Sequence, residues 1–159
     1  MFRVCIGFQS LASILAEAEQ AKDGSETGGI LLGFDPDHRG VIRITGVTGA
    51  GPHAERTPHR FLRDRDFAQR AADNAFSASG AEWVGEWHTH PAGSSGPSAT
   101  DLETYRSFLS DDSLGFYVFT CLIATPGSPS DLGQTALTPW LVERDRMTQP
   151  LLLVEHGPE

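Results

Sequence analysis

"WHTHPAGSSGPSATD" (residues 87–101) joins the end of an expected strand to the start of an expected helix. Residues 81–90 have the aromatic, alternating character of a strand, and Pro91 ends it because proline cannot donate a ladder hydrogen bond. Residues 98–109 have the apolar spacing of a helix, with Ser98 as its N-cap. The stretch therefore predicts a strand, a turn rich in glycine, serine and proline, and a capped helix.

The two histidines and the aspartate of this stretch have the character of metal ligands. His88 and His90 are separated by one residue, so on a strand both imidazoles point to the same face. Asp101 lies in the first turn of the helix, where the helix dipole favours a carboxylate. If the loop folds back, these three side chains can hold one metal ion. Such a set leaves the fourth tetrahedral position open for water, as in a catalytic zinc site.

Each of these residues also has an ordinary structural explanation. Ser98 and Asp101 are close to a capping box, in which both side chains accept N–H groups at the helix start. A single strand histidine such as His88 is commonly a core residue with its polar atoms satisfied. The separate residues leave both explanations open. The combined pattern, His-x-His followed after seven residues by Ser-x-x-Asp, is specific and favours a metal site.

A metal hydrolase also needs a base that accepts the proton of the attacking water. The stretch "GSETGGILLG" (24–33) supplies Glu26, immediately before a segment expected to be a buried strand. Gly28 and Gly29 follow it, and glycine permits close backbone approach near a ligand. The alternative is an ordinary exposed acid at a turn.

Elsewhere the chain predicts helices that separate strands. The expected class is α/β (α+β), a mixed central β-sheet flanked by helices in a single domain over residues 1–159. The predicted elements are a helix over 10–22 with Ser10 as its N-cap, strands over 27–34 and 41–48, a loop over 49–60, a helix over 61–79 ended by Gly80, a strand over 115–124, a loop over 125–134, a strand around 135–144 and an edge element over 150–156.

The bulk composition argues against several classes of protein. The chain has 159 residues, a formal net charge of −9 and 39% hydrophobic residues, which is typical of a globular domain. The acidic balance argues against nucleic-acid binding, and the apolar stretches are too short to span a bilayer. Cys5 and Cys121 are isolated in the sequence, so we expect reduced, buried thiols. These observations predict a cytoplasmic protein with no nucleic-acid partner and no membrane partner.

The motif residues together resemble a known family. Glu26, the run His88-Thr89-His90-Pro91, then Ser98 and Asp101 match the JAMM motif of the MPN+ metalloproteases, of the Prok-JAB type. The resemblance covers most of the chain and implies the MPN/JAMM fold. The segments "ETGGILLG", "PHRFLRD" and "GEWHTHP" look most like bacterial ubiquitin-like deconjugases. Those enzymes are encoded beside E1-like and E2-like enzymes in antiphage operons of the CBASS and Bil kinds.

The resemblance implies a mechanism and a substrate class. One catalytic Zn²⁺ would be held by His88, His90 and Asp101. Glu26 would act as general base on the water at the open metal position, and Ser98 would donate a hydrogen bond to the developing oxyanion. The bond cleaved would follow the C-terminal glycine of ubiquitin or a ubiquitin-like protein. The implied partners are this protein or its conjugate, a CD-NTase among the candidates, and the E1/E2-like enzymes of the same operon.

Two competing interpretations belong to related proteins. Some JAMM enzymes release a small residue from the C-terminus of a sulfur-carrier protein by the same metal chemistry. Other MPN proteins have lost the ligands and serve as scaffolds without metal, whereas this chain keeps each motif residue.

Two polar features near the motif also leave alternatives open. Glu86 shares the strand face of His88, so it could either orient that ligand or be an exposed carboxylate. The basic run at 53–65 could form a surface for an acidic partner. The favoured alternative is a solvated helix face in which Arg60 pairs with Asp64.

Overall fold

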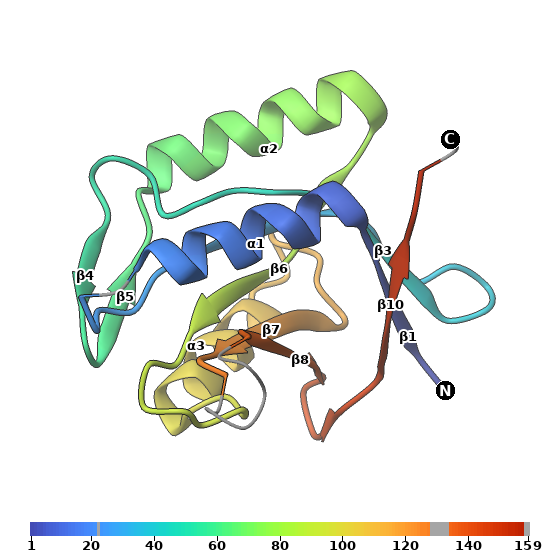
Figure 1. Ribbon diagram of the computed structural model, residues 1–159. Coiled ribbons are helices and arrows are strands. Elements are labelled where there is room, and N and C mark those ends of the chain that lie inside the picture. Colours follow the sequence, from blue (N-terminus) through green and yellow to red (C-terminus); the bar gives the residue numbers. More distant parts are fainter. Residues whose placement is uncertain (22, 128–133, 158–159) are drawn as a thin grey trace.

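The computed structural model describes residues 1–21, 23–127 and 134–157. Within them, eight strands form one mixed sheet in the order β10-β1-β3-β2-β6-β7-β8-β9, and three helices flank it (Figure 1). The predicted mixed sheet flanked by helices is therefore confirmed. The elements are β1 (Arg3–Gly7), α1 (Phe8–Gln20), β2 (Gly28–Phe34), β3 (Val41–Val47), β4 (Glu55–Thr57), β5 (Arg60–Leu62), α2 (Arg65–Ser79), β6 (Glu82–Thr89), α3 (Ala99–Ser110), β7 (Phe119–Thr125), β8 (Ala136–Val142), β9 (Met147–Thr148) and β10 (Leu151–Glu155).

Alternating side chains place the helices on opposite faces of the sheet. On β2, Leu31 packs in the same cluster as Ile14 of α1, whereas Ile30 and Leu32 pack against Ala68 of α2. Since successive strand residues point to opposite faces, α1 and α2 cover different faces. Helix α3 packs through Tyr105 and Leu109 on the same face as α2, because Trp83 contacts both of their clusters.

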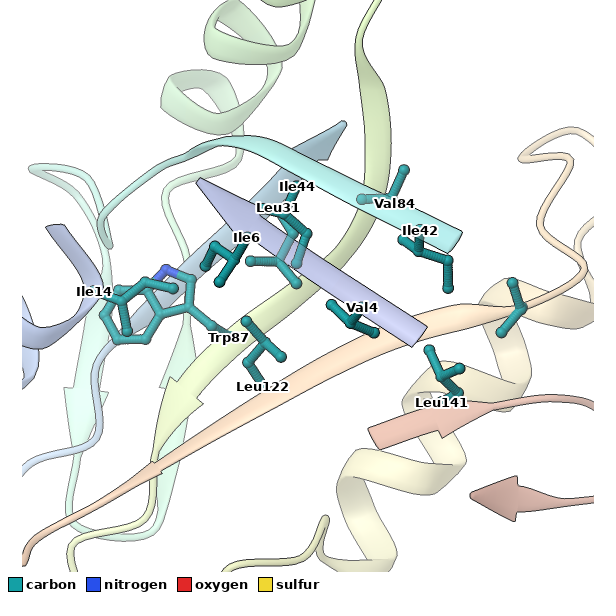
Figure 2. Close-up of a cluster of buried hydrophobic side chains, with 11 residues drawn as sticks. Val4, Ile6, Ile14, Leu31, Ile42, Ile44, Val84, Trp87, Leu122 and Leu141 are labelled. Carbon is teal, nitrogen blue, oxygen red and sulfur yellow. The ribbon is translucent and has the colours of Figure 1, made fainter. Parts of the chain in front are cut away.

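The largest buried cluster fixes the position of β6. Figure 2 shows apolar side chains of β1, β2, β3, β6, β7 and β8 in one cluster, with Ile14 of α1 at one end beside Trp87. Trp87 belongs to this cluster, is 1% exposed, and donates its indole N–H to the Thr48 carbonyl at 2.9 Å. A slip of β6 by one residue would move Trp87 to the other face, so the register is strongly specified. With Trp87 facing α1, His88 must face α3.

The amino-terminal region differs from the prediction. The strand β1 was not predicted, and α1 begins directly after it at Phe8, with Gly7 as its N-cap. The prediction of Ser10 as the N-cap is therefore wrong, and Ser10 lies buried inside the helix. This five-residue strand is held by parallel pairing with β10 on one side and β3 on the other, and such tertiary contacts leave little local signature in the sequence.

The segment before α2 also differs. Residues 49–60, predicted as a loop, contain β4, which pairs with β5 in a two-stranded hairpin. Helix α2 begins at Arg65 because the Asp64 carboxylate caps it, accepting the Phe67 N–H at 3.0 Å. The Asp64 carboxylate also accepts the His53 N–H at 3.1 Å. Arg60 lies on β5 and Asp64 is the N-cap of α2, so the suggested Arg60–Asp64 pair on a helix face is wrong. The predicted end at Gly80 is confirmed, with φ of 76°.

Several smaller predictions can also be compared with the structure. Cys5 and Cys121 are buried and free, as predicted. The short strand β9 was not predicted, whereas β10 confirms the edge element. Of the predicted loop 125–134, residues 128–133 lie outside the described residues, as does Lys22 at the end of the predicted helix 10–22. Among the described residues, none of the helices is long and apolar enough to cross a membrane.

Candidate metal centre and active site

Three candidate ligands meet at the carboxyl end of β6. The Nε2 atoms of His88 and His90 lie 2.9 Å apart, and each lies 3.4 Å from Oδ2 of Asp101. Strand β6 carries His88 between β2 and β7, while Asp101 comes from the first turn of α3. The loop between β6 and α3 therefore folds back and brings Asp101 beside the two histidines, which is the arrangement that the sequence predicted for a metal site.

This donor set fits a tetrahedral metal ion. Zinc ligands lie about 2.0–2.2 Å from the ion, so two tetrahedral ligands are about 3.3 Å apart. The 3.4 Å separations between Asp101 and each histidine match this value, and the two Nε2 atoms lie somewhat closer, at 2.9 Å. One aspartate with two histidines is a ligand set that zinc accepts. Three protein ligands leave a fourth position for water or substrate, which is the arrangement of catalytic sites.

The loop after β6 orients His90. Nδ1 of His90 lies 2.8 Å from the backbone carbonyl oxygen of Ser94, which can only accept, so this nitrogen carries the proton. Nε2 is then free to bind a metal. The neighbouring Ser95 carbonyl accepts the indole N–H of Trp140 at 2.7 Å, which ties the loop to β8. The glycine- and serine-rich loop therefore fixes the tautomer of one ligand.

Asp101 is both a helix-capping residue and a candidate metal ligand. The Ser98 hydroxyl accepts the Asp101 N–H at 3.1 Å and the Asp101 carboxylate accepts the Ser98 N–H at 2.6 Å, so the predicted capping box is present. Burial disfavours the ionised carboxylate, but hydrogen bonds from His88 and His90 hold the pKa of Asp101 far below its ordinary value. For His90, burial opposes the charged form, yet Asp101 and the Ser94 carbonyl raise its pKa. The cluster thus keeps a carboxylate available for a cation.

Glu26 is held at the rim of the same cleft by its main chain. The next residue, Thr27, exchanges two hydrogen bonds with Thr89 of β6, at 2.9 and 2.8 Å. The Glu26 N–H donates to the Thr57 carbonyl at 2.8 Å, and Nε of Arg56 donates to the Glu26 carbonyl at 3.0 Å. The β4–β5 hairpin, seen in Figure 1 beside the segment that joins α1 to β2, therefore clamps Glu26.

The electrostatics of Glu26 suit a proton acceptor that is partly shielded from water. Burial raises the pKa of its carboxyl group, and the nearby His88 and His90 act in the opposite direction. A carboxyl pKa moved toward neutrality makes proton transfer in both directions easier. Glu26, Ser98 and the three candidate ligands all line one cleft of about 950 Å³.

Gly28 and Gly29 allow β2 to pack closely against its neighbours, because neither glycine carries a Cβ atom. A Cβ atom on Gly28 would lie 2.2 Å from the Trp87 carbonyl oxygen and 2.8 Å from the His88 Cβ. On Gly29 it would lie 2.0 Å from the Thr48 carbonyl oxygen. The predicted close backbone approach is present, but the backbone approached belongs to β6 and to Thr48.

We therefore expect Gly28→Ala to destabilise the protein by about 1–3 kcal/mol, since β2 and β6 must separate at His88. For a chain of this size, each kcal/mol lowers Tm by about 2–4 °C, which calorimetry would detect. Gly46→Ala on β3 is the matched control, because its Cβ would make an ordinary contact at 3.7 Å. An unchanged Tm for Gly28→Ala would contradict the packing argument.

Glu86 does neither of the two things predicted for it. Its carboxylate pairs with a terminal guanidinium nitrogen of Arg63 at 3.0 Å, and the Glu86 side chain is 16% exposed. The Arg63 guanidinium also lies over the Trp83 ring, 5.0 Å from the centroid. The basic run thus contributes Arg63 to the cleft wall beside β6.

Sequence reasoning missed three elements that build the site. These are the hairpin that clamps Glu26, the Ser94 carbonyl that orients His90, and Tyr105, whose hydroxyl lies 3.4 Å from Nδ1 of His88. The spacing of Tyr105 four residues after Asp101 was a usable signal, because it places both side chains on one helix face. The backbone contacts leave no such signal.

Comparisons with known proteins agree with this architecture. The family model of prokaryotic homologs of the JAB domain, Prok-JAB, matches residues 8–133. The probable metalloprotease y4qB of Sinorhizobium fredii is 38% identical over 87 residues, which are 53% of this chain and 52% of that protein. The CD-NTase/cGAS isopeptidase of Vibrio cholerae is 33% identical over 92 residues, 56% of this chain and 58% of that protein. The chain thus spans about half the length of these curated relatives.

Two solved structures share the fold. A protein of Desulfitobacterium hafniense has a TM-score of 0.70 at 22% identity, and the match covers 98% of this chain and 95% of that protein. A protein of Salinibacter ruber has a TM-score of 0.57 at 26% identity, and the match covers 94% of this chain and 90% of that protein. The family match extends over both Glu26 and the segment from His88 to Asp101. This chain is also similar to proteins named as a metalloprotease and an isopeptidase. The predicted relationship is confirmed: the chain belongs to the Prok-JAB family, the prokaryotic homologs of the JAB domain.

Proposed function

We propose that this protein is a zinc-dependent isopeptidase and peptidase that cleaves after the C-terminal glycine of a ubiquitin-like protein. The observation that carries the proposal is the convergence of the His88, His90 and Asp101 donor atoms in a cleft that Glu26 and Ser98 also line. Metal ligands, a base and a hydrogen-bond donor in one cleft are the parts that metal-assisted hydrolysis of an amide needs.

Zn²⁺ held by His88, His90 and Asp101 would polarise the scissile carbonyl and lower the pKa of a bound water to about 7. The Glu26 carboxylate would accept a proton from the attacking water and then deliver it to the leaving amine. Its main-chain clamp restricts the position of this carboxylate, and positioning of this kind is a large part of catalytic efficiency. Glu26 therefore serves first as base and then as acid.

Ser98 would stabilise the oxyanion that develops on the scissile carbonyl. Its oxygen already accepts the Asp101 N–H, and an accepting hydroxyl keeps its own hydrogen for donation. The helix cap and the oxyanion contact are therefore compatible in one side chain. Capping also fixes the hydroxyl relative to Asp101, so the donor is oriented before substrate binds.

We expect Ser98→Ala to lower kcat about 100- to 1000-fold, since one oxyanion donor contributes about 3 kcal/mol. Loss of the cap should also lower the free energy of unfolding by about 1 kcal/mol. Ser94→Ala is the matched control, because its side chain lines the same cleft and its backbone carbonyl is retained. Equal kcat values for the two variants would refute the oxyanion role.

The substrate would be recognised through an extended, glycine-ended tail. Such a tail can add to a free strand edge and be read through its backbone. The β4–β5 hairpin offers an edge beside the cleft, which its residues Glu55, Arg60 and Leu62 help to line. Hydrogen bonds from the hairpin to Glu26 would then couple tail binding to the position of the base.

The biological setting follows from the relatives. The similarity to a protein named CD-NTase/cGAS isopeptidase supports a CD-NTase, or another target joined to a ubiquitin-like protein by E1/E2-like enzymes, as the substrate. We infer a role in antiphage defence in the cytoplasm. An adjacent gene pair of the E1/E2 type would support this assignment. A neighbouring cysteine synthase gene would instead indicate processing of a sulfur-carrier protein.

The function is tested with a fusion that joins a ubiquitin-like protein found encoded beside this gene, or a CD-NTase C-terminus, to a reporter. Mass spectrometry of the products should place the cut directly after the terminal glycine. Removal of metal by a chelator should stop cleavage, and added Zn²⁺ should restore it. Cleavage that persists after complete removal of metal would overturn the proposed mechanism.

A further inference from the structure

A buried tyrosine contacts the ring of His88 on the side away from the other ligands. Tyr105 lies on α3, is 0% exposed, and stacks on Phe119 with ring centroids 4.8 Å apart. Its hydroxyl lies 3.4 Å from Nδ1 of His88 and 3.3 Å from Sγ of Cys121. Cys121 is also buried, so the three polar atoms form a chain enclosed in the core between β6, β7 and α3.

The chemistry of a metal-bound imidazole requires a hydrogen-bond partner at this position. If Nε2 of His88 binds a metal, Nδ1 must carry the ring proton and needs an acceptor. His90 meets this requirement with the Ser94 carbonyl. For His88, the oxygen beside Nδ1 is the phenol oxygen of Tyr105.

A hydroxyl can form a hydrogen bond with Nδ1 of His88 whether or not that nitrogen carries the ring proton. With the proton on Nδ1, the Tyr105 oxygen accepts it and its own hydrogen points toward Sγ of Cys121, a weak acceptor. With Nδ1 unprotonated, the thiol can donate to Tyr105 and the hydroxyl can donate to His88. The two-bond chain can therefore run in either direction, and when Nδ1 carries the proton only the thiol of Cys121, a weak donor, gives up its bond to Tyr105.

We propose that Tyr105 is a positioning residue for the metal, because its hydroxyl holds His88 in the tautomer and orientation that present Nε2 to the ion. The inference rests on the proposed zinc site and deepens it. It also replaces the predicted role of Glu86, which pairs with Arg63. Phenylalanine retains the stacking on Phe119 and removes only the hydroxyl, so Tyr105→Phe isolates this contribution.

The experiment measures Zn²⁺ affinity by competition with a chromophoric chelator, for the full chain and two variants. Loss of such an outer contact typically weakens metal binding about 10- to 100-fold, which we expect for Tyr105→Phe. Tyr117→Phe is the matched control, because it makes the same chemical change at a side chain that is 51% exposed. The control should bind Zn²⁺ as the unmodified protein does.

A second measurement separates metal positioning from general stability. Each protein is melted with and without Zn²⁺, and the rise in Tm caused by the metal is compared between variants. A merely structural hydroxyl would lower both melting temperatures together and leave this rise unchanged, whereas weaker binding reduces it. Equal affinity and an equal rise for Tyr105→Phe would overturn the inference. Failure of the unmodified protein to bind Zn²⁺ would instead overturn the proposed metal site itself.

Discussion

Glu26→Gln is expected to abolish cleavage of the fusion substrate while Zn²⁺ stays bound. The amide has nearly the shape of the carboxylate but cannot accept the proton of the attacking water. General base catalysis contributes about 10²- to 10⁴-fold, so kcat should fall by at least about 100-fold. Zinc binding should persist because Glu26 is not one of the three converging donors. The measurements are kcat with the fusion and metal content of the purified variant.

The matched control for this variant is Glu86→Gln. It makes the same substitution in the same cleft at a carboxylate that pairs with Arg63, and the amide oxygen can still accept from the guanidinium. We expect it to retain cleavage. If Glu26→Gln were as active as Glu86→Gln, Glu26 would not be the base, and the role of the hairpin clamp would need another explanation.

His88→Ala is expected to lose both the metal and the activity. His88 is 3% exposed and lies at the carboxyl end of β6, and its Nε2 is one of three donor atoms, so the variant leaves two candidate ligands. Zinc should be absent after dialysis, and the rise in Tm on adding Zn²⁺ should disappear. Atomic absorption and calorimetry provide these two measurements.

The control is His53→Ala, which removes a histidine from the same cleft outside the converging group. His53 lies beside Asp64 and its side chain is 87% exposed. This variant should bind Zn²⁺ normally. Zinc bound equally by His88→Ala and the unmodified protein would show that His88 is not a ligand.

The strand–turn–helix unit could be predicted because its signals are local. His88 and His90 share a strand face by alternation, and the capping box of Ser98 and Asp101 is recognisable within four residues. The register of β6 is set by the neighbouring Trp87, whose large apolar surface belongs in the core. The strand alternation and the burial of Trp87 therefore place His88 and His90 together on the opposite face, and the grouping of His88, His90 and Asp101 could be predicted from the sequence.

The hairpin and β1 could not be predicted because their strands are stabilised by partners distant in sequence. Three-residue strands such as β4 and β5 are too short to show a period, and β1 owes its place to pairing with β3 and β10. The partner of Glu86 was also missed, since Arg63 reaches it only through the tertiary fold. Motif spacing thus predicts which residues meet, and the packed structure determines what holds each of them.

The central claim is that His88, His90 and Asp101 hold the catalytic metal, and anomalous diffraction at the zinc edge tests it most directly. Crystals of the zinc-loaded protein should show one strong peak at β6, about 2.0–2.2 Å from both histidine Nε2 atoms and the Asp101 carboxylate. A fourth ligand that is water, facing Glu26, would complete the predicted arrangement. A peak elsewhere, or none at these three side chains, would contradict the account.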